Sequence, residues 1–250
     1  MKDREYVAYV MDTRAFADED VFDMFLDMVS EYRREKVRKL RMKKDQQASL
    51  AAGILLEAAL ERHACIDRHS ITYIKDKKGK PCIYGLNNIS FSISHTDGCV
   101  AVILGPAPCG IDVEGIRHMP DRIVERLFSD EDISRLDTMK SDEVRKSVYG
   151  TSVWTRRESY GKMTGTGIMM SDETQEKVMD GDYMLEKHIL LKNFCLSDGE
   201  ISELCFRKNG WSDGNVPDYG YIIAVSVPDE PKTDMHIEYV DSLQFAESAM

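Results

Sequence analysis

The strongest constraint on the fold comes from two short strand patterns that follow each other closely. Residues 91–95 read FSISH, in which apolar and polar residues alternate, and residues 99–104 read CVAVIL. The turn residues at 96–98, Thr-Asp-Gly, separate them, which is typical of an antiparallel hairpin. A third strand pattern, IDVE at 111–114, follows after a short loop. The sequence therefore predicts an antiparallel meander of three strands.

Segments with the apolar spacing of helices lie on both sides of this block. One apolar stripe runs from Ala48 to Leu60, and a second helical pattern extends from about Ser141 to Met163. Further strand patterns follow at 183–196, 201–207 and 219–227. The order of helix and small sheet thus occurs twice. We expect an α+β fold of two pseudo-symmetric halves, each with a helix packed on a small, mainly antiparallel sheet.

The expected boundaries follow from this repeat. A chain of 250 residues suits one large domain or two small ones. We place the first half at residues 1–108, the second half at 109–228 and a C-terminal tail at 229–250.

Composition excludes several classes of protein. No apolar stretch approaches the roughly 20 residues that a membrane span needs, and the first residues, MKDREYV, carry no signal-peptide pattern. The net charge of −11 argues against a general nucleic-acid binder. The six cysteines lack the spacing of a zinc site, so we expect reduced thiols and a cytoplasmic location.

Positive charge is concentrated in one segment of this acidic chain. Residues 33–44 contain eight Lys or Arg residues and a single acid, Glu35. Such a segment suits the binding of an anion, and it equally suits a solvated helix face. Its position in the sequence does not decide between the two.

Two acidic residues share one face of the strand predicted at 111–114. Asp112 and Glu114 are separated by one residue, and side chains two apart on a strand point the same way. Two such carboxylates repel each other unless a cation or water screens them. The pair indicates either a cation site or a solvated edge strand.

A second set of chemically useful residues lies on the long helix predicted at 141–163. Trp154, Glu158 and Lys162 follow at intervals of four and share one helix face. They form either a surface Glu–Lys pair or a third carboxylate beside an ammonium group, which suits a divalent cation on phosphate oxygens. His95, next to Ser94 at a strand end, is an ordinary polar residue unless an anion lies beside it.

Three motifs together resemble the Sfp-type 4′-phosphopantetheinyl transferases. They are FSISHTDG at 91–98, GIDVE at 110–114 and WTRRESYGKMTGTGI at 154–168. The last is similar to the family pattern W-x-x-K-E-[AS]-x-x-K-x-x-G-x-G-[LI]. REKVRKL at 34–40 and GKP at 79–81 add support, and the resemblance is colinear to about residue 227.

The resemblance implies an enzyme that transfers the phosphopantetheine arm of coenzyme A to a serine of an apo acyl or peptidyl carrier protein. The products are the holo carrier protein and 3′,5′-ADP. The resemblance places Mg²⁺ on Asp112, Glu114 and Glu158, and it makes Glu158 the general base for the serine hydroxyl. Lys162 falls on a lysine that contacts the pyrophosphate and counts with Glu158 as catalytic. The residues implied at coenzyme A are Arg33, Lys36, Lys80, Ser94, His95, Asp112 and Lys162, with Arg33 and Lys36 near the 3′-phosphate.

The same resemblance predicts coenzyme A in the cleft between the halves, a monomer, and a carrier protein that binds transiently. This sequence departs from the family at three places. Ala48 stands where the family has arginine, Arg157 replaces a lysine, and Thr166 replaces another. Two alternatives stay open: a catalytically silent module that binds coenzyme A or a carrier, and a metal-dependent hydrolase that uses the same carboxylates.

Overall fold

The chain folds as two units, each with its own sheet. The computed structural model describes residues 5–75, 79, 81–86, 88–168, 183–184, 189–204, 206–207, 210–211, 220–228 and 233–249. The first unit comprises Met1–Pro108 and Lys232–Met250, and the second comprises Cys109–Pro231. Each contains a 22-residue helix and a mainly antiparallel sheet, so the α+β class predicted from the sequence is confirmed.

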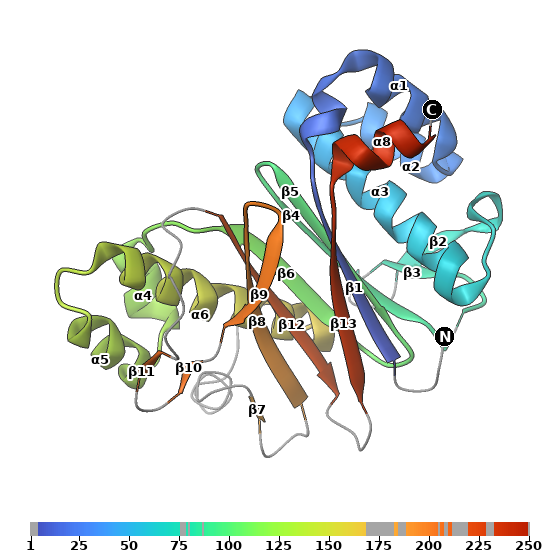
Figure 1. Cartoon of the computed structure of the whole chain (residues 1–250). Coiled ribbons are helices and arrows are strands. Elements are labelled where there is room, and N and C mark those ends of the chain that lie inside the picture. Colours follow the sequence, from blue (N-terminus) through green and yellow to red (C-terminus); the bar gives the residue numbers. More distant parts are fainter. Residues whose placement is uncertain are drawn as a thin grey trace. The chain divides into compact units, whose positions relative to one another are not determined.

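The first unit is built around a sheet with the strand order β13-β1-β5-β4 (Figure 1). The long helix of the unit, α3, packs against β5 and β4. The β4–β5 hairpin predicted from FSISH and CVAVIL is present, with Ser94 opposite Ala101 and His95 opposite Val100. The elements are β1 (Glu5–Asp12), η1 (Arg14–Ala17), α1 (Glu19–Met28), α2 (Glu31–Arg38), α3 (Lys43–Ala64), η2 (Arg68–Ser70), β2 (Tyr73–Lys75), β3 (Pro81–Ile83), β4 (Ser90–Thr96), β5 (Cys99–Gly105), β13 (Asp234–Val240) and α8 (Ser242–Ala249).

The segment expected to be a C-terminal tail is part of this first unit. Strand β13 pairs with β1 in parallel, and α8 follows it, so the first and last strands of the chain lie side by side (Figure 1). The buried carboxylate of Asp12 on β1 fastens the segment, since it accepts hydrogen bonds from the Tyr239 hydroxyl at 2.6 Å and the Ser242 hydroxyl at 2.6 Å. The prediction of a tail was wrong because this pairing partner is more than 220 residues away in the sequence.

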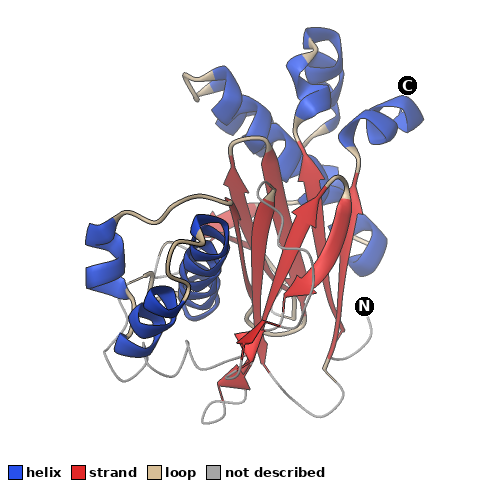
Figure 2. Cartoon of the chain, turned by 60° about the vertical axis from the view of Figure 1, so that its left-hand side comes forward, coloured by secondary structure: helices blue, strands red, loops and turns tan. Residues whose placement is uncertain are grey.

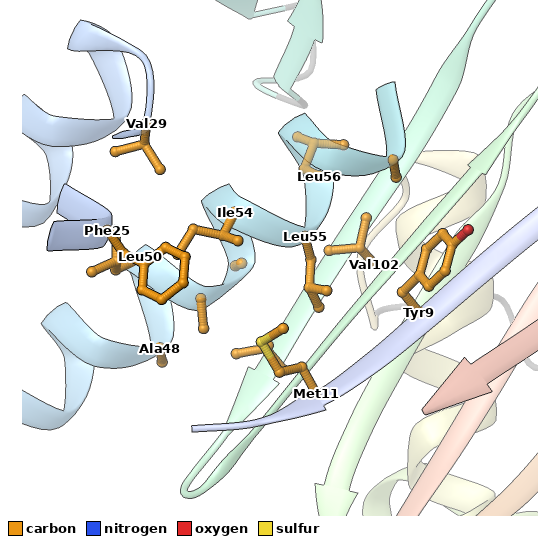
Figure 3. Packing of buried hydrophobic residues seen from close by; sticks show 14 of the residues in the cluster. Tyr9, Met11, Phe25, Val29, Ala48, Leu50, Ile54, Leu55, Leu56 and Val102 are labelled. Carbon is orange, nitrogen blue, oxygen red and sulfur yellow. The ribbon is translucent and has the colours of Figure 1, made fainter. Parts of the chain in front are cut away.

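The core of the first unit lies between α3 and the sheet. Leu55 of α3 points toward Met11 and Val102 of the strands, and Leu50 lies beside Phe25 of α1 (Figure 3). The apolar stripe predicted from Ala48 to Leu60 is this buried face of α3. Burying a Leu or Phe side chain contributes about 1.5–3 kcal/mol, so these contacts hold α1 and α3 on the sheet.

The second unit has a sheet with the order β6-β12-β8-β7, and β9 also pairs with β8. Every pairing in this sheet is antiparallel. The long helix α6 packs against β6, β12 and β8. Figure 2 distinguishes the helices (blue) from the strands (red). The elements are β6 (Gly110–Gly115), α4 (Asp121–Leu127), α5 (Asp130–Thr138), α6 (Glu143–Thr164), β7 (Tyr183–Met184), β8 (Ile189–Ser197), β9 (Glu200–Leu204), β10 (Phe206–Arg207), β11 (Gly210–Trp211) and β12 (Tyr221–Pro228).

The predicted three-strand meander is wrong in its third member. Strand β6 does not pair with β5 and instead pairs with β12 in the sheet of the second unit. Pro106 and Pro108 lie in the connection, and proline has a fixed φ angle and no N–H to donate, which disfavours a tight hairpin there. The chain therefore passes from one sheet to the other at this loop.

The helix starts follow the local sequence. Ser30 caps α2, since its hydroxyl accepts from the Arg33 N–H, and Ser129 forms a reciprocal capping box with Asp132 at the start of α5. Among the helices in the described ranges, none has the length and apolar character that a bilayer crossing demands.

Candidate functional site

Strand β6 presents two carboxylates to the helix α6. Asp112 and Glu114 lie opposite Ala224 and Ile222 of β12, two residues apart and so on one face of the strand. Asp112 is only 3% exposed, although β6 is the edge strand of its sheet. The solvated acidic edge considered from the sequence is therefore wrong for Asp112.

Helix α6 covers this face with the side chains predicted to share one of its sides. The Lys162 ammonium donates to Asp112 Oδ1 at 2.7 Å, and the Trp154 indole N–H donates to Glu114 Oε1 at 3.2 Å. Two turns of helix thus run alongside β6, with Glu158 between the two contacts. We call Asp112, Glu114 and Glu158 the carboxylate cluster.

The close approach of α6 to β6 depends on Gly110, the first residue of β6. A Cβ atom built on Gly110 would lie 1.8 Å from the carbonyl oxygen of Ser159 and 2.8 Å from the backbone N of Met163. Both contacts are with helix backbone, which a rotamer change cannot relieve. Glycine at this position therefore sets the distance between the strand that carries Asp112 and the helix that carries Lys162.

The carboxylate cluster is electrostatically strained. Burial raises the pKa of Glu114, and repulsion from Asp112 raises it further. Burial likewise raises the pKa of Glu158, with added repulsion from Asp112 and Glu114 that Lys162 partly offsets. Arg117 also lies 3.6 Å from Glu114 Oε2. The three acids are thus near enough to repel one another, and cations are gathered around them.

The cluster has the oxygen donors that a hard cation such as Mg²⁺ prefers. Within the ranges that the structure describes, however, no three acidic, His or Cys side chains are gathered closely enough to form a metal site. In this conformation the Lys162 ammonium supplies the positive charge at Asp112. The donor chemistry fits a divalent cation, whereas the arrangement shown is one of carboxylates around a lysine.

The first unit holds a separate group of cations. The side chain of Arg33 is 3% exposed and lies along α3 at Gly53, with its Cζ 5.7 Å from the centre of the Tyr73 ring. Burial lowers the pKa of Lys36, and the charges of Arg33 and Lys75 lower it further. We call Arg33, Lys36 and Lys75 the basic cluster. The solvated helix face considered from the sequence is therefore wrong for Arg33, which is buried, whereas Lys36 beside it is exposed.

Other predicted site residues have varied surroundings. Ser94 is buried and His95 is exposed at the end of β4, while Lys80 lies outside the described residues. Ala48, where the family has arginine, is buried in the apolar core. Its neighbour Ser49 is also buried, and its hydroxyl has no hydrogen-bond partner in the described part of the chain.

Sequence reasoning missed three contributors. Gly110 was part of a motif, but only the packed helix reveals why a side chain is excluded there. Lys75 has no site assignment from the sequence, and the structure places it at the end of strand β2, where its charge acts on Lys36 of α2. The hydrogen bond from Trp154 to Glu114 joins residues 40 apart, and only the i, i+4 spacing of Trp154 to Glu158 hinted at it.

Comparison with known proteins agrees with this assembly. The model for the N-terminal part of 4′-phosphopantetheinyl transferases matches residues 17–106, and the 4′-phosphopantetheinyl transferase superfamily model matches residues 108–189. The chain belongs to this superfamily. The two matches meet within the loop that joins β5 to β6, where the chain passes from one sheet to the other.

Individual relatives extend over most of the chain. It is 26% identical over 223 residues to 4′-phosphopantetheinyl transferase Sfp of Bacillus subtilis, covering 88% of this chain and 92% of that protein. It is 27% identical over 224 residues to the transferase ffp of Bacillus subtilis, covering 87% and 91%. A solved holo-(acyl-carrier-protein) synthase of Bacillus anthracis aligns with 40% of this chain and 91% of its own, at 16% identity and a TM-score of 0.32.

Proposed function

We propose that the protein transfers the phosphopantetheine arm of coenzyme A to a serine of an apo acyl or peptidyl carrier protein and releases 3′,5′-ADP. The observation that carries the proposal is the carboxylate cluster with Lys162, assembled from the motifs at 110–114 and 154–168. Membership of the superfamily and the similarity to Sfp support the same reaction.

In this proposal Glu158 is the general base. It would take the proton from the carrier serine hydroxyl while the serine oxygen bonds to the phosphorus of the phosphopantetheine arm and the bond to the 3′,5′-ADP oxygen breaks. A serine is a poor nucleophile until a base accepts its proton. Burial raises the pKa of Glu158 above that of an ordinary glutamate, which brings it closer to the working pH of a general base.

Lys162 would stabilise negative charge on the pyrophosphate. Its ammonium already lies in the carboxylate cluster, 2.7 Å from Asp112 Oδ1, so a small side-chain movement could transfer its hydrogen bonds to a phosphate oxygen. Asp112, Glu114 and Glu158 are the residues that would hold Mg²⁺, and the ion would neutralise charge that develops on the leaving phosphate. The three acids repel one another, and a cation bound between them would relieve that repulsion, which supports this assignment.

The remaining cofactor contacts are proposed from the residue types and positions. Arg33 and Lys36 would lie at the 3′-phosphate, Ser94 and His95 at other coenzyme A phosphates, and Lys80 at the cofactor. We further infer that the protein is a cytoplasmic monomer with no role in nucleic-acid binding, in keeping with its net charge of −11.

The direct test is the intact mass of an apo carrier protein after incubation with the protein, coenzyme A and Mg²⁺. We expect the mass to rise by one phosphopantetheine group with wild-type protein and not with Glu158→Gln. Glu131→Gln is the matched control, because Glu131 is an exposed glutamate of the same unit that pairs with Arg135. Absence of product with several unrelated carriers would contradict the proposal, and coenzyme A binding without product would favour the silent module.

A further inference from the structure

Helix α2 and strand β2 are held together by two tyrosines. The rings of Tyr32 on α2 and Tyr73 on β2 stack with centroids 4.7 Å apart and planes 27° apart. The next residue of α2, Arg33, places its guanidinium carbon 5.7 Å from the centre of the same Tyr73 ring. The Tyr73 hydroxyl donates to Glu57 at 3.4 Å, which fixes β2 to α3 as well.

This contact brings lysines of the two elements together. Lys36 lies one helical turn after Tyr32 and Arg33 on the same side of α2. Lys75 lies two residues after Tyr73 and therefore on the same face of β2, the face that meets α2. The interaction of both Arg33 and Lys75 with Lys36 agrees with this placement.

In the part of the chain that the structure describes, no ion pair joins the basic cluster to a carboxylate. The ion pairs of α2 in the described part of the chain join Arg34 to Glu31 and Lys39 to Glu35. The buried carboxylate of Glu57 accepts from the N–H and hydroxyl of Ser30 at 3.0 and 2.6 Å, in addition to the Tyr73 hydroxyl. Three like charges held together in this way favour binding of a multivalent anion.

We propose that Lys75 is a specificity-determining residue that binds the phosphomonoester of coenzyme A together with Arg33 and Lys36. The inference rests on the proposed function for the identity of the ligand. A phosphomonoester carries a charge of about −1.5 to −2 near pH 7, which three cations match better than two. At position 48, where the family resemblance places a further cation, this chain has a buried alanine.

The test compares coenzyme A with 3′-dephospho-coenzyme A, which lacks only this phosphate. Because Lys75 is exposed, Lys75→Gln is expected to fold normally and to raise KM for coenzyme A about three- to tenfold, the range of a partly solvated charged contact. The Lys75→Gln substitution leaves kcat unchanged, and it leaves the KM for 3′-dephospho-coenzyme A unchanged. Lys75→Arg restores the KM for coenzyme A. Lys39 is an exposed lysine of α2 that pairs with Glu35, and Lys39→Gln changes the KM for neither cofactor.

Equal effects of Lys75→Gln on both cofactors, or no effect on either, would overturn the inference. Calorimetric binding of the two cofactors separates it from the proposed function. If wild-type protein prefers coenzyme A and Lys75→Gln lowers that preference three- to tenfold, but no transfer to a carrier occurs, the role of Lys75 stands and the transferase proposal fails. If transfer occurs and the preference is unaffected by Lys75→Gln, the role of Lys75 fails alone.

Discussion

Replacing Gly110 by alanine tests whether the close contact of β6 and α6 builds the carboxylate cluster. The added Cβ would lie 1.8 Å from Ser159 O, and real Cβ atoms essentially never approach other atoms within 3.0 Å. Helix and strand must therefore separate by at least ~1.2 Å, since neither backbone can rotate away. Overpacking of this kind costs about 1–3 kcal/mol, and a shift of about 1 Å at a reacting group can cost about 100-fold in rate.

Gly115→Ala is a matched control at the other end of the same strand. A Cβ on Gly115 has no atom within 4 Å, and its φ is not in the left-handed region, so this variant keeps wild-type behaviour. Urea unfolding measures the loss of stability, and initial rates of carrier modification measure the loss of transfer. We expect Gly110→Ala alone to lose at least 1 kcal/mol and about 100-fold in kcat/KM. If the two variants behave alike in both assays, the reasoning about Gly110 is refuted.

Three further predictions concern single side chains. Gly53→Ala should change the unfolding free energy by no more than ~1 kcal/mol, since alanine favours helices. Its Cβ nevertheless meets Arg33 at 2.6 Å, so affinity should fall for coenzyme A but not for the dephospho compound in calorimetry. Glu158→Gln should lower kcat/KM about 100-fold or more. Because burial raises the pKa of Glu158 above its ordinary 4.5, ionisation of Glu158 destabilises the folded state. At pH 7 the Glu158→Gln variant should therefore unfold at a higher urea concentration than wild type. This gain in stability should vanish below pH 4.5, where Glu158 is protonated in both the folded and the unfolded state. Burial opposes ionisation of Asp12, but hydrogen bonds from Arg14, Ser242 and Tyr239 hold its pKa well below the ordinary 3.8, so Asp12→Asn should lose about 1–3 kcal/mol at pH 7. That loss should shrink as pH falls below 3.8, and an unchanged difference at pH 2 in urea unfolding would contradict the assignment.

The sequence predicts the local elements well because their signals are local. The alternation in FSISH and the turn at 96–98 specify the β4–β5 hairpin, and the apolar stripe from Ala48 to Leu60 specifies the buried face of α3. Long-range pairing has no comparable signal. Residues 234–240 alternate between exposed and half-buried positions, which is a strand pattern, but nothing near them indicates that β1 is the partner.

For the site, the sequence identifies residue types but not distances. The spacing of Asp112 and Glu114 predicts a shared strand face, and the spacing of Glu158 and Lys162 predicts a shared helix face. The hydrogen bond from Lys162 to Asp112 depends on the packing of α6 against β6, which the sequence does not describe. Lys75 was missed for the same reason, because its neighbour Lys36 lies on another element.

Both units place like charges near one another at the expense of stability, and in both a glycine permits the arrangement. Gly53 leaves room on α3 for the Arg33 side chain, and Gly110 lets α6 approach the two carboxylates of β6. A chain selected only for stability would disperse these charges, because burial of ionised groups that repel one another is unfavourable. The raised pKa values in the carboxylate cluster and the lowered pKa of Lys36 are the signs of that penalty. A ligand of opposite charge relieves this repulsion. A cation at the carboxylate cluster and a phosphate at the basic cluster would therefore each gain binding free energy from repulsion that the fold already contains.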